Sequence, residues 1–228
     1  MKFHVAATNS AGQTKNTLSL GARFIRSLSI CFTVSTLPIT LCGVAGADES
    51  DFKIHSDTFL NGATLPTSMA DQFAVNGVNT CTIDGSAGGN TSPELSWENV
   101  PRDTRSFAVV MYDVTASFTH WGIYNISGSK HGLPAGAGVA GGNYGEQVPN
   151  DFGSTGYEGP CPPPGVVPYA HHYVITVYAL DKELKLAVFA NFPQNPDTLF
   201  NALALAGAEG HVLARASIGG YFSATPSQ

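Results

Sequence analysis

The chain has 228 residues, of which 43 % are apolar and 12 % are charged. This length suggests one domain or two small ones, and the combination of ample apolar content and low charge argues against a disordered protein. Residues 48–228 hold 7 of the 11 basic and all 17 acidic side chains, which leaves a net charge of −10. This negative net charge argues against nucleic-acid binding and against electrostatic attachment to an anionic membrane.

Residues 1–47 are expected to be a secretory signal that is cleaved. A basic stretch ends at Arg26, and the run that follows is uncharged and apolar with small residues. It ends in Ala45-Gly46-Ala47, an A-x-A pattern that signal peptidase accepts. A proline and several Ser and Thr make the run a poor transmembrane helix, although an uncleaved anchor and an organelle transit peptide stay open as alternatives. We therefore expect a secreted or periplasmic protein with no stable membrane span after cleavage.

Four cysteines occur in the chain, and two of them, Cys31 and Cys42, leave with the expected signal. Cys81 and Cys161 then remain, and two thiols in an oxidising compartment favour one disulfide. Neither lies in a C-x-x-C pair, which argues against a structural zinc site. A bridge requires Cα atoms within about 7 Å of each other. The sequence does not show that distance, so a disulfide and two free thiols both stay open.

Residues 48–228 are expected to form a single domain, because no repeat or low-complexity linker divides them. Plentiful Gly and Pro favour many turns between short strands. Apolar runs rich in β-branched and aromatic residues predict strands, in chain order, at 95–97, 106–112, 120–126, 172–180 and 214–222. The Gly/Pro-rich segment from about 128 to 165 predicts a long loop, and loops of that length are usually functional or mobile.

One helix is predicted near the carboxyl end of the chain. Asn195 can cap its first turn, and Pro196 suits the first helical position. The apolar positions that share one face at helical spacing are Leu199, Leu203 and Ala206. The helix should end near Gly207 or Gly210. Together the elements predict a mostly-β fold, an antiparallel β-sandwich or barrel-like core with one or two small peripheral helices.

A polar pocket is predicted where three of the strands begin or end. Asp113 ends the strand at 106–112, and His120 opens the next one. Side chains alternate between the two faces of a strand, so His171 and Tyr173 share one face while His172 points to the other. A nearby carboxylate fixes an imidazole's tautomer and raises its pKa, and charged imidazoles and a phenol are good donors to phosphate or carboxylate groups. Metal binding by two His and one carboxylate, or a purely structural role, stays open.

The segment 156–165, with the sequence GYEGPCPPPG, is the second candidate for the pocket. Its consecutive prolines stiffen the backbone, and Gly159 permits a tight turn. A rigid loop of this kind can line a pocket and present backbone N–H groups, or it can be only a structural turn.

These segments together resemble the phosphatidylethanolamine-binding protein family, in particular its bacterial branch that is often labelled Raf kinase inhibitor-like. The motifs occur in the family's order over about 59–222 and include SPELSW at 92–97, HW at 120–121, NDFG at 150–153, GYEGPCPP at 156–163 and HHY at 171–173. The resemblance implies an antiparallel β-sandwich with an anion pocket that accepts phosphoryl head groups. The residues that it assigns to this pocket are Asp113, His120, His171 and Tyr173, with Tyr157, Gly159 and Pro160 as a wall.

The turn after Asp113 departs from the family pattern. The family usually has D-P-D-A-P, whereas this chain has D-V-T-A-S at 113–117. Both prolines and the second carboxylate are lost, and Thr115 replaces that carboxylate. We therefore expect a looser turn and a less acidic pocket.

The sequence favours an exported binding protein for a small anionic ligand or a phospholipid head group, with no cofactor and no bound metal. No G-x-S-x-G element and no H-E-x-x-H motif is present, so no catalytic residue is predicted, and a His–Asp or metal-dependent hydrolase is the weaker alternative. Inhibition of a protein partner such as a protease or a kinase is the other alternative, which the family label implies. Export would separate the chain from a cytosolic kinase, and the sequence indicates no partner surface.

Overall fold

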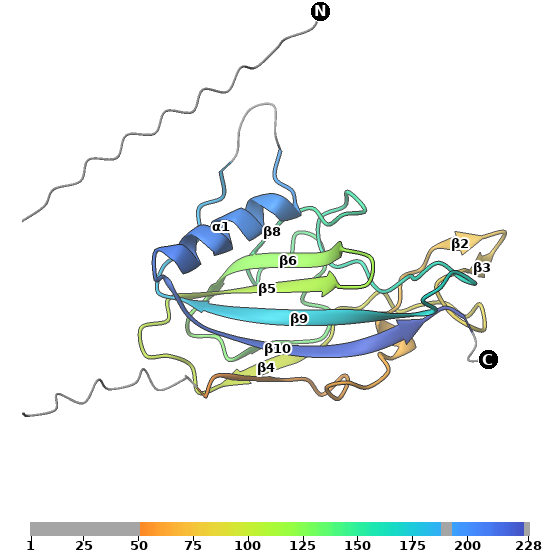
Figure 1. Ribbon diagram of the computed structural model, residues 1–228, viewed down its shortest axis with the longest axis horizontal. Helices are drawn as coiled ribbons and strands as arrows, with labels where there is room; N and C mark the ends of the chain where they lie inside the picture. Colours follow the sequence, from red (N-terminus) through yellow and green to blue (C-terminus); the bar gives the residue numbers. More distant parts are fainter. Residues whose placement is uncertain (1–50, 188–192, 226–228) are drawn as a thin grey trace, which may run out of the picture. The chain divides into compact units, whose positions relative to one another are not determined.

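The computed structural model describes residues 51–187 and 193–225 (Figure 1). The expected signal, residues 1–47, lies outside these ranges. Two antiparallel sheets form the core of the domain. The five-stranded sheet has the order β10 (Val212–Ser223), β9 (Ala170–Leu180), β5 (Ser106–Asp113), β6 (Phe118–Ser127) and β8 (Glu146–Gln147). The three-stranded sheet has the order β1 (Lys53–His55), β4 (Leu95–Glu98) and β7 (Gly132–Leu133).

The main core lies between these two sheets. One face of β5 presents Phe107, Val109 and Met111, which pack in the same apolar cluster as Leu95 and Trp97 of β4. The intervening residues of β5 point to the opposite face of the five-stranded sheet, where a second apolar cluster forms. Because β5 is buried on both faces, its sequence is a continuous apolar run rather than an alternation of apolar and polar residues.

Helix α1 (Pro196–Ala208) covers part of that opposite face (Figure 1). The Asn195 side chain accepts a hydrogen bond from the Thr198 N–H at 3.1 Å, and the Thr198 hydroxyl lies at 3.2 Å from the Asn195 N–H, which together form a capping box. Leu199 and Leu203 pack against Val110 of β5 in the second cluster. The helix therefore buries the face that its apolar spacing predicts.

The mostly-β sandwich predicted from sequence is confirmed, and the described residues contain one α-helix and one short 3-10 helix, η1 (Thr67–Met69). Each predicted strand is present and is one to three residues longer than expected. The segment 128–165 is not a plain loop, because it contains β7 and β8, each of two residues. A small hairpin of β2 (Ala74–Val75) and β3 (Val78–Asn79) was not predicted. Among the described residues, no helix is long and apolar enough to cross a membrane.

Candidate functional site

A cavity of about 190 Å³ lies where β5 ends and where β6 and β9 begin. The four polar residues proposed from sequence, Asp113, His120, His171 and Tyr173, all line it. Asp113 pairs with Tyr173 across β5 and β9 and with Phe118 across β5 and β6. The cavity therefore forms at the shared end of three neighbouring strands of one sheet.

His171 and Asp113 form a buried hydrogen-bonded pair at the centre of this site. Nδ1 of His171 lies 2.6 Å from Oδ2 of Asp113, and the two side chains are 10 % and 3 % exposed. The contact fixes a proton on Nδ1 and leaves Nε2 as the ring nitrogen available to a ligand. Neighbouring His172 points to the other face and stacks on Tyr221 with ring centroids 4.7 Å apart. The predicted separation of these two histidines is thus present in the structure.

The Tyr173 hydroxyl remains a hydrogen-bond donor at every physiological pH. Burial raises the pKa of Tyr173 far above its usual value of 10.0, and the negative charge of Asp113 raises it further. The His120 and Tyr173 rings meet edge to face with centroids 5.2 Å apart. The phenol is therefore held beside both histidines as a neutral donor.

His120 enters the cavity because β6 contains a β-bulge. Met111 pairs with Trp121 and Tyr112 pairs with Thr119, so His120 is the extra residue on β6. A bulge lets consecutive side chains point to the same side. Trp121 consequently remains in the core while His120 also faces inward.

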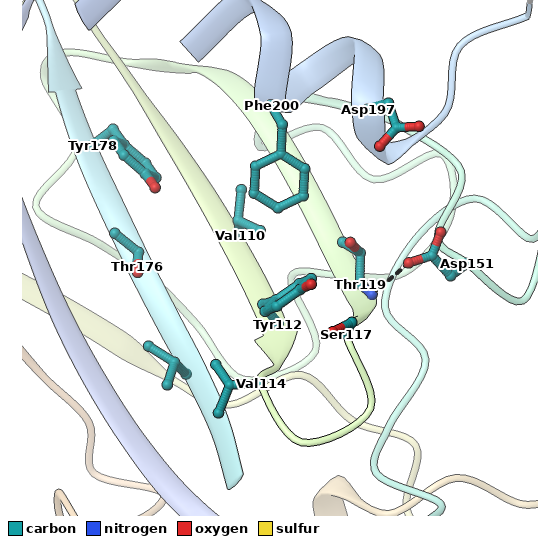
Figure 2. Close-up of a pocket in the computed structure, with 11 residues that line it drawn as sticks. Val110, Tyr112, Val114, Ser117, Thr119, Asp151, Thr176, Tyr178, Asp197 and Phe200 are labelled. Atoms are coloured by element: carbon teal, nitrogen blue, oxygen red, sulfur yellow. Dashed lines mark hydrogen bonds between the residues drawn. The ribbon is translucent and has the colours of Figure 1, made fainter. Parts of the chain in front are cut away.

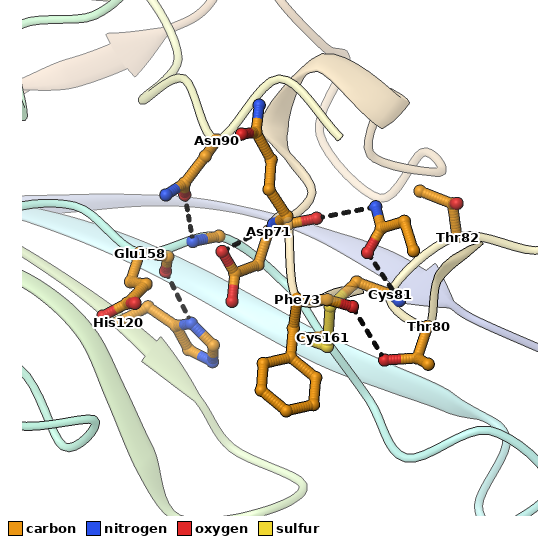
Figure 3. Close-up of a disulfide and its surroundings, with 12 residues drawn as sticks. Asp71, Phe73, Thr80, Cys81, Thr82, Asn90, His120, Glu158 and Cys161 are labelled. Atoms are coloured by element: carbon orange, nitrogen blue, oxygen red, sulfur yellow. Dashed lines mark hydrogen bonds between the residues drawn. A yellow bond between two sulfur atoms is a disulfide. The ribbon is translucent and has the colours of Figure 1, made fainter. Parts of the chain in front are cut away.

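The protonation of His120 differs from the expectation of two charged imidazoles. Its Nδ1 lies 2.8 Å from the Glu158 carbonyl oxygen, which can only accept, so Nδ1 carries the proton (Figure 3). Burial lowers the pKa of His120 below its usual value of 6.5, and this outweighs the opposite effects of Glu158 and Asp113. At neutral pH the ring is therefore uncharged, and Nε2 is an acceptor rather than a donor.

The turn after Asp113 is held by hydrogen bonds, although it lacks both prolines of the family pattern. Oδ1 of Asp113 accepts hydrogen bonds from the N–H groups of Thr115 and Ala116 at 2.8 and 3.1 Å. The Thr115 hydroxyl accepts a hydrogen bond from the His172 N–H at 2.9 Å, which ties the turn to β9. Thr115 therefore replaces the missing rigidity of proline with side-chain hydrogen bonds. It does not line the cavity, where Asp113 is the single carboxylate.

The proline-rich segment forms one wall, but with different residues from those predicted. Cys161, Pro162 and Pro163 line the cavity, whereas Tyr157, Gly159 and Pro160 do not. These three hold the wall from behind through hydrogen bonds: Tyr157 Oη donates to the Met69 carbonyl at 2.9 Å, Gly159 N to Asn90 Oδ1 at 2.8 Å, and Asp71 N to the Pro160 carbonyl at 3.1 Å. Their role in the structure is to position the wall.

A disulfide joins Cys81 to Cys161 and fastens the same wall to the segment after β3 (Figure 3). Its Cα atoms are 4.4 Å apart, and the sequence separation is 80 residues. A carboxylate oxygen of Asp71 lies within 4.8 Å of both sulfur atoms, and among residues 51–187 and 193–225 these three side chains are the one group close enough to share a metal ion. Sulfur atoms that are bonded to each other do not offer thiolate ligands, so this cluster does not hold a metal in the oxidised protein.

The charge around the cavity is unusual for an anion site. Within the part of the chain that the structure describes, no Lys or Arg side chain lines it. The basic residues next to the same strands lie at the opposite strand ends, since Arg105 precedes β5, Lys130 follows β6 and Lys182 follows β9. An anion in this cavity would depend on histidine, tyrosine and backbone donors alone.

Several lining residues were not proposed from sequence. Phe118 and Phe152 meet with ring centroids 4.6 Å apart, and both contact the His120 ring at 5.1 and 5.7 Å. Phe152 belongs to the NDFG motif that the sequence singled out, but nothing in its spacing indicates that the motif reaches this strand end. The cavity is therefore more apolar at its rim than the polar residues alone predict.

Comparison with known proteins agrees with this fold. A family model described as phosphatidylethanolamine-binding protein matches residues 55–223. The UPF0098 protein YbcL of Escherichia coli (strain K12) is 44 % identical over 153 residues, which cover 64 % of this chain and 76 % of YbcL. A crystal structure of E. coli YbcL, described as a new member of the mammalian PEBP family, superposes with a TM-score of 0.56 at 34 % identity and covers 75 % of this chain and 98 % of that chain.

The sandwich with its strand-end cavity is thus that of a small binding protein. The chain belongs to the phosphatidylethanolamine-binding protein family. Membership places it among binding proteins rather than enzymes, in agreement with the interpretation of the sequence. LppC of Mycobacterium tuberculosis (strain ATCC 25618 / H37Rv), whose name describes a lipoprotein, is 33 % identical over 136 residues, which cover 58 % of this chain and 57 % of LppC.

Proposed function

We propose that this chain is an exported binding protein that holds a phosphoryl or carboxylate group of a small molecule, such as a phospholipid head group, in the cavity between β5, β6 and β9. The observation that carries the proposal is the buried pair of Asp113 and His171, with 2.6 Å between Oδ2 and Nδ1. Asp113 is the counter-ion for the imidazolium form of His171, which donates from Nε2. Hydrogen bonds from a charged donor to an anionic oxygen are about twice as strong as neutral ones.

The two histidines offer a ligand different hydrogen-bonding groups. His171 offers a donor and Tyr173 a second one, whereas neutral His120 offers an acceptor at Nε2. A ligand that fills the site best therefore accepts through one group and donates through another. A hydrogen phosphate or a phosphoryl group linked to an ammonium group meets both requirements, and a fully ionised carboxylate meets only the first.

Export is supported by three independent features. The first 47 residues have the three-part layout of a secretory signal. The disulfide of Cys81 and Cys161 is typical of proteins in an oxidising compartment. One relative carries a lipoprotein name, and lipoproteins are exported before they are anchored.

Isothermal titration calorimetry with inorganic phosphate and with phosphoethanolamine tests the binding site. We expect both to bind wild type and the matched control His172→Gln, whose side chain lies on the other face of β9. His171→Gln loses the charged donor, which corresponds to a loss of about tenfold or more in affinity. Negligible binding by wild type, or equal binding by wild type and His171→Gln, would overturn the proposal.

A further inference from the structure

A second cavity, of about 510 Å³, lies on the opposite face of the five-stranded sheet (Figure 2). The same two strands serve both cavities with alternating residues. Asp113 and Tyr173 face the first cavity, and their neighbours Tyr112 and Val174 face the second. The volume is in the range of small-molecule sites, which is about 300–1,000 Å³. The second cavity is therefore large enough to hold a small ligand of its own.

Aromatic rings form the sides of this second cavity. Tyr112 of β5 meets Phe200 of α1 edge to face, with ring centroids 5.9 Å apart. Tyr178 of β9 lies farther along the same sheet face, and the floor between the rings is formed by Val110 and Thr176 (Figure 2). All three rings are half-buried, so parts of them remain accessible to a bound molecule.

Two carboxylates complete the rim beside Tyr112 and Phe200 (Figure 2). Oδ2 of Asp151 accepts a hydrogen bond from the Thr119 N–H at 2.6 Å, which fixes this side chain at the rim. Asp197 lies in the first turn of α1. Within residues 51–187 and 193–225 neither carboxylate forms an ion pair, and no Lys, Arg or His lines the cavity.

We propose that this second cavity binds a small organic cation, a protonated amine or a quaternary ammonium group attached to an apolar or aromatic body. The cation would lie between Asp151, Asp197 and the face of an aromatic ring, where cation–π attraction adds to the attraction of the carboxylates. The apolar body would cover Val110 and Thr176. An anion of the same size would meet two carboxylates and, among the described residues, no cationic side chain, so the cavity selects by charge as well as shape.

Phenethylamine and 2-phenylethanol form a matched pair of probes, because they share the aromatic body and differ in charge. A titration followed by amide cross-peaks in two-dimensional NMR reports both affinity and location. We expect phenethylamine to shift the amides that surround Phe200 and Thr176 and to bind about tenfold more tightly than 2-phenylethanol. Added salt should reduce that difference, since the rim carboxylates are exposed.

The preference for the amine should fall in Asp197→Asn and in the double variant Asp151→Asn/Asp197→Asn. Phe200→Ala should weaken the binding of both probes. Asp103→Asn is the control, because Asp103 is an exposed carboxylate away from this cavity. Binding of inorganic phosphate in the His171 cavity should be unchanged in Asp197→Asn, which separates this proposal from the proposed function. Equal affinity for the two probes, cross-peak shifts elsewhere in the protein, or an undiminished amine preference in the double variant would overturn it.

Discussion

Gly159 supports the cavity wall at a point where only glycine fits. A Cβ atom on this residue would overlap the Met69 carbonyl oxygen and would lie 2.9 Å from the Ala70 carbonyl carbon. Both neighbours are backbone atoms, so no side-chain rotation relieves the overlap. Gly159→Ala must therefore move the wall away from the end of η1 and the residues that follow it.

The cost of that movement can be worked out from the contacts. Overpacking of a dense core costs about 1–3 kcal/mol, and rigid backbone neighbours favour the upper end. If the wall moves instead, it loses the hydrogen bonds from Gly159 N to Asn90 Oδ1 and from Asp71 N to the Pro160 carbonyl, each worth about 1 kcal/mol. By either route we expect a loss of about 2–3 kcal/mol in the free energy of unfolding.

Urea denaturation of the disulfide-bonded protein, followed by far-UV circular dichroism, measures this loss. Gly207→Ala is the matched control, because its Cβ has no neighbour closer than 4.0 Å and lies in α1. Alanine should stabilise that helical position by about 0.5 kcal/mol. The reasoning fails if Gly159→Ala costs less than about 1 kcal/mol, or if both variants change stability equally.

Three further predictions concern the surroundings of the cavity. In Cys81→Ser/Cys161→Ser the free energy of unfolding, measured by urea denaturation, should fall by about 4 kcal/mol, because the disulfide spans 80 residues in the unfolded chain. A reductant should cause the same loss in wild type and no further loss in the variant. Tyr157→Phe should lose about 1–2 kcal/mol, because it leaves the buried Met69 carbonyl without a donor; unchanged thermal stability contradicts this. Folding lowers the pKa of His120 below its usual value of 6.5, so just below pH 6.5 the unfolded chain binds more protons than the folded protein. The stability that neutral His120 contributes is therefore present above pH 6.5 and is lost as the pH falls toward the pKa that His120 has in the folded state. Between about pH 7.5 and about pH 5.5 the free energy of unfolding of His120→Gln should fall by less than that of wild type.

Much of the fold follows from local patterns in the sequence. The run is apolar at every residue from 107 to 112 because β5 packs against an apolar cluster on each face, with the second sheet on one side and α1 on the other. The cap at Asn195 likewise fixes the start of α1. The two-residue strands β7 and β8 were not predicted because they form by pairing with distant strands, at Leu95 and Ile123. They have no residue pattern of their own that indicates a strand.

The site was predictable to the extent that it depends on alternation. Strict alternation along β9 is enough to bring His171 and Tyr173 together and to exclude His172. The roles of the wall residues were not predictable in the same way. A sequence shows that Gly159 is small, but the close approach of Met69, 90 residues earlier in the chain, becomes visible only once both segments are placed.

The bulge at His120 is the feature that links the two cavities. Thr119 points to the second cavity, and His120 and Trp121 both point away from it. Without the extra residue, a strand with Trp121 in the core would turn His120 toward α1, and the first cavity would lose its acceptor. Phe118 would also leave the cavity, because it is two residues from His120 and follows the same alternation. The chemistry of the anion cavity therefore depends on one irregular step in β6, which no alternating pattern in the sequence reveals.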